Sequence, residues 1–311
     1  MAPRPAFYSN ASSLEHDTGG HPERVERMVA IENALAAHGW LGFERVRSPA
    51  VPRDVLELVH DAAYVDSIER VAAAGGGQLD PDTAISEGSF AAALHAVGGA
   101  VAMVQRLVDH GAGAIGFSAH RPPGHHALAD RAMGFCLFNS IAVAARFAID
   151  RLGLQRVMIV DWDVHHGNGT SDAFWDSDAV LFASIHQWPL YPGSGRRDEV
   201  GVAAGRGYTV NLPVPAGTGD AQYLSLLHGT VVPLARLYRP QLLLVSAGFD
   251  AHRDDPLAGC DVTEQGFGAM ATVLLELSAE LQVPLGLVLE GGYDLGALSG
   301  SVLATMQALI S

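Results

Sequence analysis

Short apolar runs alternate with longer amphipathic stretches along most of the chain. The apolar runs, several of them rich in β-branched residues, predict buried strands at residues 112–118, 157–160, 179–185, 208–212, 241–246 and 285–289. Apolar residues at helical spacing predict helices at residues 22–38, 61–74, 86–110, 139–152, 220–238 and 263–281, with one more closing the chain. This alternation predicts an α/β fold with a mostly parallel, multi-stranded sheet and helices on both of its faces.

Proline and glycine residues are expected to start, interrupt or weaken some helices. Pro52 is expected to open a further helix, because proline fits the first helical turn. Pro233 has no backbone N–H and is expected to interrupt the helix at residues 220–238. The pair Gly98-Gly99 is expected to weaken the middle of the helix at residues 86–110.

Polar side chains follow the predicted strand at residues 157–160 directly. Within eight residues the chain places Asp161, Asp163, His165, His166 and Asn168. Alternate side chains of an extended segment share one side, so Asp161, Asp163 and His165 can converge. A solvated loop that caps the next helix is one interpretation. The density of these groups after a buried strand favours a metal site at the carboxyl end of a parallel sheet.

Other predicted strands also end in polar side chains. These are His125 and His126 after residues 112–118, Asp250 after residues 241–246, and Glu290 with Tyr293 after residues 285–289. Histidines in a surface loop are the ordinary alternative in a chain with 14 His. Because the carboxyl ends of parallel strands meet at one edge of a sheet, we expect these groups to belong to one site.

Composition and charge narrow the class of protein. The 311 residues carry 19 Lys plus Arg against 34 Asp plus Glu, a formal charge of −15, which argues against a nucleic-acid binder. The two cysteines, Cys136 and Cys260, form no metal or disulfide pattern and fit a reducing compartment. The first residues show no signal-peptide pattern, and the apolar tracts fall short of a membrane span, so we expect a cytoplasmic protein.

The polar groups form a set suited to metal-assisted hydrolysis of an amide. Two Asp and one His suffice to hold a catalytic zinc ion, although the carboxylates also permit Fe²⁺ or Mn²⁺. A metal ion lowers the pKa of bound water, and a histidine nearby can act as base and then as acid. A tyrosine hydroxyl can stabilise the oxyanion of a tetrahedral intermediate. No phosphate-binding loop or serine-nucleophile motif competes with this interpretation.

The sequence resembles the arginase/deacetylase superfamily, specifically a bacterial class II-type histone deacetylase-like amidohydrolase. The resemblance covers nearly the whole chain and implies one catalytic domain over residues 1–311. The matching motifs, in chain order, are His21-Pro-Glu-Arg24, Arg121-Pro-Pro-Gly-His-His126, Gly134-Phe-Cys136, Asp161-Trp-Asp-Val-His-His-Gly-Asn-Gly169, Gly248-Phe-Asp250, Asp255-Pro-Leu-Ala-Gly259 and Glu290-Gly-Gly-Tyr293.

The resemblance implies roles for the residues of the metal site. Asp163, His165 and Asp250 match the zinc ligands of the family, and Tyr293 matches the tyrosine that polarises the substrate carbonyl. A structural potassium ion is implied near Asp161, Asp163, His165, Ser184 and Ile185, and a second, more distal one near Phe174, Ser177, Val180 and Tyr208.

Two histidines match the tandem histidines of the family, with His126 as the base and acid. Asp161 matches the partner of His125, and Asn168 matches the partner of His126. Such partners fix the tautomer and orientation of an imidazole. An amide at Asn168 is expected to leave His126 less basic than a carboxylate would.

The substrate tunnel of the family is matched by Gly134, Phe135 and Tyr191, with Leu257 at its rim. Polyamine-preferring members carry an acidic rim residue or a long dimerising loop, and Leu257 is not acidic. The expected substrate is therefore acetyl-lysine on a protein or peptide, or a similar small acylated amine. An acetylpolyamine amidohydrolase and an acyl-amine-binding module without turnover are the alternatives. The sequence leaves the oligomeric state open.

Overall fold

A computed structural model describes residues 3–310, so the ends of the predicted 1–311 domain, residues 1, 2 and 311, lie outside the described chain. Its centre is one eight-stranded sheet in which every neighbouring pair of strands is parallel. The strand order is β2 (Glu44–Arg47), β1 (Ala6–Ser9), β5 (Ile115–Ser118), β10 (Leu285–Leu289), β9 (Leu242–Ala247), β6 (Val157–Asp161), β7 (Val180–Gln187) and β8 (Thr209–Val214).

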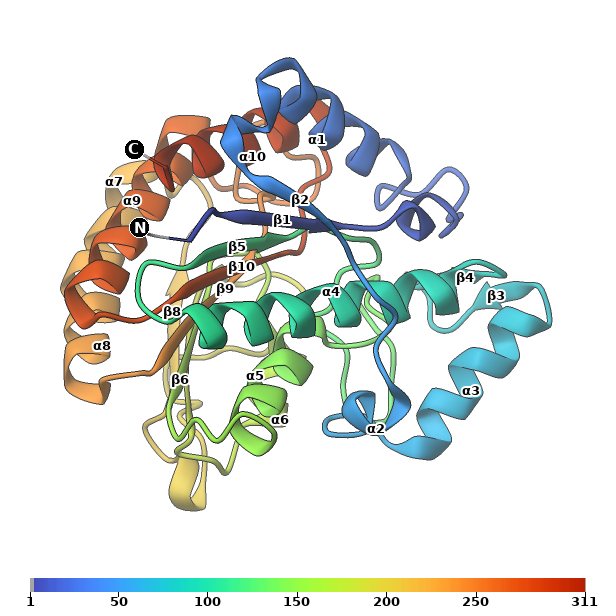
Figure 1. The fold of residues 1–311 in the computed structure, drawn as a ribbon, viewed down its shortest axis with the longest axis horizontal. Helices are drawn as coiled ribbons and strands as arrows, with labels where there is room; N and C mark the ends of the chain where they lie inside the picture. Colours follow the sequence, from blue (N-terminus) through green and yellow to red (C-terminus); the bar gives the residue numbers. More distant parts are fainter. Residues whose placement is uncertain (1–2, 311) are drawn as a thin grey trace.

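Helices cover both faces of this sheet (Figure 1). One face carries α1 (Glu26–Ala37), α7 (Asp220–Leu226), α8 (Val232–Tyr238), α9 (Glu264–Leu281) and α10 (Leu295–Ala308). The other face carries α3 (Ala62–Ala73), α4 (Ser89–His110) and α5 (Ser140–Asp150), with the short helices α2 (Arg53–Leu56) and α6 (Asn168–Ala173) nearby. The predicted α/β fold with helices on both faces is confirmed.

Strand β6 shows why the sheet has two cores. Met158 and Val160 pack in the core beneath α9 and α10, whereas Val157 and Ile159 pack in the core beneath α4 and α5. Successive side chains of a strand point to opposite faces, so a strand buried on both sides must be apolar throughout. All six strands that the apolar runs predicted are present.

Three features differ from the predicted pattern. Two further strands, β1 and β2, extend the sheet at one edge, and a small antiparallel pair, β3 (Gly76–Gln78) and β4 (Ala84–Ser86), lies before α4. The predicted helix at residues 220–238 is interrupted by a π-helical turn at Leu227–Val231, ahead of Pro233. Pro233 instead lies in the first turn of α8, a position that tolerates proline.

Helix α4 is continuous through its two glycines. A side chain at Gly98 would overlap the carbonyl of Pro49, and one at Gly99 would overlap His120 and Ser48. The glycines therefore allow close packing where a weakened middle was expected.

Helix α4 also bears on the expectation that every apolar tract falls short of a membrane span. Among the described residues α4 alone is long and apolar enough for a membrane span, with a mean hydropathy of 1.4 over 18 residues. Most of that window, 61%, is buried inside the protein, as in a core helix.

The sheet gathers the predicted polar groups at one edge. Strands β5, β10, β9 and β6 are consecutive neighbours, and each is followed by one of the polar segments singled out in the sequence. Because the strands are parallel, all four segments leave the same end of the sheet. The fold thus brings together residues that are far apart in the chain.

Candidate active site

Asp163, His165 and Asp250 form a buried cluster in which one ligand atom from each residue lies within 4.8 Å of the others. The Nδ1 atom of His165 is 3.0 Å from Oδ2 of Asp250 and 3.2 Å from Oδ1 of Asp163. Donors around a tetrahedral zinc ion, with bonds of about 2.0 Å, are roughly 3.3 Å apart. The spacing therefore fits the predicted zinc site.

Backbone amides hold both carboxylates in place. Asp163 accepts from the N–H of His165 at 2.9 Å and from that of Gly291 at 2.9 Å. Asp250 accepts from the N–H of Val164 at 2.8 Å. A side chain at Gly248 or at Gly291 would overlap the carboxylate of Asp163, so glycine is needed on both sides of the cluster.

The electrostatics of the cluster also fit a cation. Burial, together with the charge of Asp163, raises the pKa of Asp250 above its usual value. Among the described residues, these two carboxylates form ion pairs with histidines and with no arginine. Two buried carboxylates side by side repel each other unless a positive charge lies between them. The oxygen and nitrogen donors suit Zn²⁺, and also Fe²⁺ or Mn²⁺.

The two histidines of the turn after β5 have different partners. The Nδ1 atom of His125 is 2.9 Å from Oδ2 of Asp161, whereas Nδ1 of His126 is 2.7 Å from Oδ1 of Asn168. The amide nitrogen of Asn168 donates to the carbonyl of His126 at 3.3 Å, which fixes its oxygen toward the ring. Both partner atoms only accept, so each imidazole carries its proton on Nδ1.

These partners separate the basicities of the two rings. Burial alone would lower the pKa of His125, but the charges of Asp163 and Asp161 outweigh it and hold that pKa well above the usual value. Burial lowers the pKa of His126 well below the usual value, and the charges of His125 and His165 lower it further. His126 is therefore the neutral member of the pair.

A pocket of about 220 Å³ adjoins the metal cluster at His165. It is lined by Asp82, His126, Gly134, Phe135, His165, Leu190, Tyr191, Leu257 and Tyr293. The structure thus brings all four predicted substrate residues to the pocket that also holds His126 and Tyr293. The ring of Phe135 meets Tyr293 edge to face at 5.6 Å, and Tyr191 meets His126 in the same way at 5.2 Å.

Tyr293 is fixed in this pocket from several sides. Its backbone N–H donates to Asp255 at 2.7 Å, and the guanidinium of Arg27 lies 5.0 Å from the centre of its ring. Burial raises the pKa of Tyr293 well above its usual value, so the phenol keeps its proton. A protonated phenol in the pocket can donate a hydrogen bond to a substrate oxygen.

Asp82 lines the same pocket and was not identified in the sequence. It lies between β3 and β4, and its Oδ1 accepts from the N–H of Gly134 at 3.3 Å. Burial raises its pKa, and the neighbouring carboxylate of Asp80 adds to the shift. The sequence Asp80-Pro-Asp82 was the available signal, but an acidic loop without a preceding strand gave no reason to assign it to the site.

Of the residues predicted to bind potassium, Asp161 lies on β6 and Ser184 and Ile185 lie on the neighbouring strand β7, whereas Asp163 and His165 follow β6. Asp161 pairs with Ser184 across these strands, and Asp161, Asp163, Ser184 and Ile185 are all buried. The hydroxyl of Ser184 is 2.9 Å from Nδ1 of His186. The fold therefore brings this set together around the base of the metal cluster.

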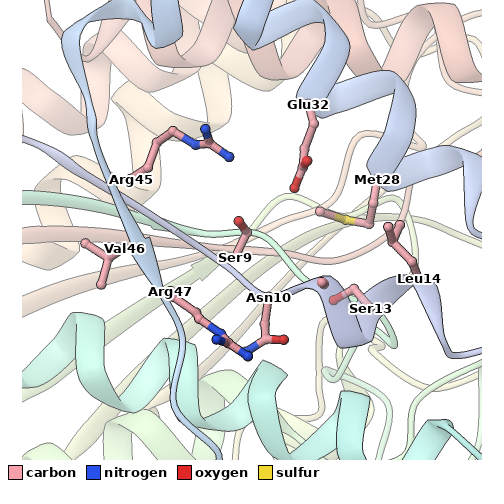
Figure 2. Close-up of a pocket in the computed structure, with 10 residues that line it drawn as sticks. Ser9, Asn10, Ser13, Leu14, Met28, Glu32, Arg45, Val46 and Arg47 are labelled. Carbon is pink, nitrogen blue, oxygen red and sulfur yellow. The ribbon is translucent and has the colours of Figure 1, made fainter.

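A second hollow, of about 390 Å³, lies at the carboxyl ends of β1 and β2 and contains none of the predicted site residues. Figure 2 shows the side chains of Glu32 and Arg45 extending into it from α1 and β2. Arg45 already stacks over Trp40 at 4.1 Å from the ring centre. The residues that line this hollow include Ser13, whose carbonyl accepts from the buried Arg121.

Comparison with known proteins places this site in a family. The histone deacetylase domain matches residues 21–309. The chain is 38% identical to the histone deacetylase-like amidohydrolase of Pseudomonas aeruginosa, over 93% of this chain and 77% of that protein. It is 41% identical to a probable deacetylase of Methanothermobacter thermautotrophicus, over 94% of this chain and 87% of that protein.

A solved structure agrees in fold. The crystal structure of the HDA15 HD domain superimposes with a TM-score of 0.93 at 36% sequence identity, covering 99% of this chain and 89% of that one. The family match, the relatives and the shared fold extend over the residues that form the site. The chain therefore belongs to the histone deacetylase family and is a hydrolase of the deacetylase type.

Proposed function

We propose that the protein removes acetyl or related acyl groups from N-acetyl-lysine, or from a similar acylated amine, by metal-assisted hydrolysis. The observation that carries this proposal is the convergence of three groups on one pocket. His165 of the metal cluster lines it, together with His126 and Tyr293. Each of these groups has a distinct task in the cleavage of an amide bond.

Asp163, His165 and Asp250 would hold the ion, with zinc as the proposed metal and Fe²⁺ or Mn²⁺ as substitutes. A divalent ion at this position supplies Lewis acidity and lowers the pKa of water to near neutrality. An ion held by these three side chains would keep at least one coordination position for water or substrate.

His126 is the proposed general base and acid. Its Nδ1 proton is directed to Asn168, which leaves Nε2 free to take a proton from water. It can then return that proton to the departing amine. His125 is held in a different state by Asp161, whose carboxylate favours the charged imidazolium. We assign His125 the electrostatic and orienting role and His126 the proton transfer.

Tyr293 would donate its hydroxyl proton as a hydrogen bond to the substrate carbonyl oxygen as negative charge develops there. The rings of Phe135 and Tyr191 would contact the aliphatic chain of the substrate, since they line the pocket that adjoins the metal cluster. Leu257 would close the rim. A potassium ion among Asp161, Asp163, His165, Ser184 and Ile185 is proposed as a structural support for the loop that carries the ligands.

The test is release of acetate from an acetyl-lysine peptide by zinc-loaded protein, with Asp163→Ala and a hydroxamate-inhibited sample as controls. We expect release that both controls abolish. The 19 Lys plus Arg residues are all arginine, so the protein has no lysine. An assay that detects acetyl-lysine therefore reports only on the substrate peptide. Equal release by Asp163→Ala would contradict the proposal.

An acetylated polyamine is the second candidate substrate, and one observation favours it. The carboxylate of Asp82 lines the same pocket as Leu257, so the rim is more acidic than the sequence predicted. A carboxylate can attract the second ammonium group of a polyamine. We would compare an acetylated polyamine with the peptide, in the wild type and in Asp82→Asn. A polyamine preference that Asp82→Asn abolishes would support this candidate, and a peptide preference in both proteins would reject it.

A further inference from the structure

A group of charged side chains outside the metal cluster is completely buried. Glu23, Arg27, Arg121 and Glu290 each have an exposed fraction of 0%. Burial of a charge is costly unless hydrogen bonds and an opposite charge compensate it. Buried ionic groups can serve to select one conformation over others, and here Arg27 and Glu290 have hydrogen-bond partners in the two loops that carry Tyr293 and His126.

Glu23 joins the two arginines. Its Oε1 accepts from Nη1 of Arg27 at 3.0 Å and from Nε of Arg121, and its Oε2 accepts from Nη2 of Arg121 at 2.7 Å. Arg121 also donates to the carbonyl groups of Ser13 and His16, at 2.9 and 3.0 Å. The start of the turn that carries the two histidines is therefore fixed by Glu23.

Arg27 extends this connection to the loop of Tyr293. Its Nε donates to the carbonyl of Gly292 at 2.7 Å, and its Nη2 donates to the carbonyl of Glu290. The same guanidinium faces the ring of Tyr293. One side chain thus holds the backbone on the amino-terminal side of Tyr293 and contacts the tyrosine itself.

The carboxylate of Glu290 connects these residues to the turn that carries His125 and His126. Its Oε2 accepts from the N–H of Gly124 at 2.7 Å and from the N–H of His125 at 3.1 Å. Gly124 is joined to Arg121 by Pro122 and Pro123, two residues with restricted backbones. Glu23, Arg27, Glu290 and Arg121 are thereby linked in a closed ring, by hydrogen bonds on three sides and by the chain on the fourth.

We propose that this buried ring is a positioning frame that sets the spacing between the proton-transfer histidine, His126, and the oxyanion donor, Tyr293. The inference rests on the proposed function of those two residues. The two loops follow neighbouring strands, β5 and β10, and the ring connects them through the hydrogen bonds of Arg27 and Glu290. Its members are positioning residues, because none of them lines the pocket.

Arg27→Lys tests the frame most directly. Lysine keeps the positive charge beside Glu23. It lacks the planar guanidinium, whose N–H groups bind the carbonyls of Glu290 and Gly292 at the same time. We expect kcat to fall about 10- to 100-fold, the scale of a misplacement of roughly 1 Å, with KM and zinc content unchanged within about twofold. In a Tyr293→Phe background the same substitution is expected to cost less than about twofold, because the group it positions is already absent.

The matched control is Glu280→Gln, which breaks an exposed pair with Arg236 on the far side of the fold and should leave kcat unchanged. A loss of equal size with and without the Tyr293 hydroxyl would overturn the proposal. So would a rise in KM at constant kcat, or a lowered Tm with normal kcat, since these indicate a role in binding or in stability alone.

Glu290 offers a second test if Arg27→Lys fails to fold. Glu290→Gln keeps an acceptor for the amides of Gly124 and His125, and should retain kcat within about threefold. Glu290→Met is similar in size but lacks the acceptor, and should lose about tenfold or more. Equal rates for both variants would contradict the frame.

Crystal structures of wild type, Arg27→Lys and Glu290→Met separate this inference from the proposed function. We expect the distance between Nε2 of His126 and the hydroxyl oxygen of Tyr293 to change by about 0.5 Å or more in both variants, the tolerance of a catalytic geometry. An unchanged distance would refute the frame whether or not the protein releases acetate. A changed distance without activity in the wild type would instead refute the proposed function.

Discussion

The Nδ1 atom of His126 lies 2.7 Å from the amide oxygen of Asn168. An amide oxygen accepts the Nδ1 proton and fixes the tautomer without adding a negative charge. The neighbouring His125 has a carboxylate, Asp161, in the equivalent position. One histidine of the pair is thus held neutral and the other charged, and in the proposed mechanism His126 transfers the proton while His125 has the orienting role.

Asn168→Asp is expected to raise the pKa of His126 and to shift the acidic limb of the kcat/KM profile to higher pH. The physical reason is that a carboxylate favours the protonated ring. Asn168→Ala should keep the acidic limb at or below its original pH and lower kcat about 10- to 100-fold, the usual cost of losing such a partner. Profiles of the three proteins between pH 5 and pH 9 check this. Superimposable profiles for wild type and Asn168→Asp would remove His126 from proton transfer.

Tyr293→Phe should lower kcat about 100- to 1000-fold while bound zinc stays constant, since it removes one oxyanion donor of the kind worth roughly 3–4 kcal/mol. The measurement is kcat together with metal content by elemental analysis. Tyr238→Phe, at the end of α8, is the control and should leave kcat unchanged, because its hydroxyl donates to the backbone carbonyl of Asp178. A rate within twofold of wild type for Tyr293→Phe would exclude the tyrosine from the mechanism.

The strands that carry the site could be predicted because each is a run of apolar residues buried on both faces. Strands β1 and β2 could not. Ala6–Ser9 is only four residues long, and Glu44–Arg47 lies at the edge of the sheet, where Glu, Arg, Val and Arg alternate between partly buried and exposed positions. The β3–β4 pair begins in a glycine run that indicated only the end of a helix.

The site residues likewise divide into those that could be assigned from the sequence and those that could not. Asp161 to Asn168 could be assigned locally, because the spacing itself brings these groups together. Asp82 and Glu23 could not, since their neighbours in the chain give no sign of their surroundings. Asp82 reaches the pocket because the β3–β4 turn folds over it, and Glu23 is buried between two guanidiniums that come from different segments. Long-range packing decides such positions, and sequence periodicity does not record it.

We expect His60 to make the stability of the protein depend on pH. Its Nδ1 lies 2.9 Å from the carbonyl of Leu128, and its Nε2 accepts from the N–H of Asn139 at 2.8 Å, so only the neutral ring satisfies both. Burial lowers its pKa from 6.5 to about 4. A depressed pKa contributes stability that is complete above the unfolded value and is lost as the pH falls through the folded value.

The free energy of unfolding is therefore expected to fall by on the order of 3 kcal/mol between pH 6.5 and pH 4 on account of His60. Urea unfolding at several pH values measures this. In His60→Gln the slope over that interval should be reduced, although the variant is less stable at neutral pH. An identical slope in both proteins would show that His60 titrates normally.

Metal binding should stabilise the fold, because it relieves the repulsion between Asp163 and Asp250. A ligand at 1,000 times its Kd adds about 4 kcal/mol to the free energy of unfolding. We expect Tm to rise when zinc is added to chelator-treated protein, and to stay constant in Asp250→Ala. A rise of the same size in Asp250→Ala would indicate that zinc binds elsewhere.

The central claim is that one divalent ion, held by Asp163, His165 and Asp250, serves the removal of an acyl group in the adjoining pocket. Its most direct test is a titration of metal-free protein with zinc, in which bound zinc and the initial rate of acetate release from an acetyl-lysine peptide are measured on the same samples. We predict a rate that rises in proportion to bound zinc and levels off at one ion per chain, with neither binding nor activity in Asp163→Ala. Full activity in the metal-free protein, or zinc-dependent activity that survives Asp163→Ala, would contradict the account.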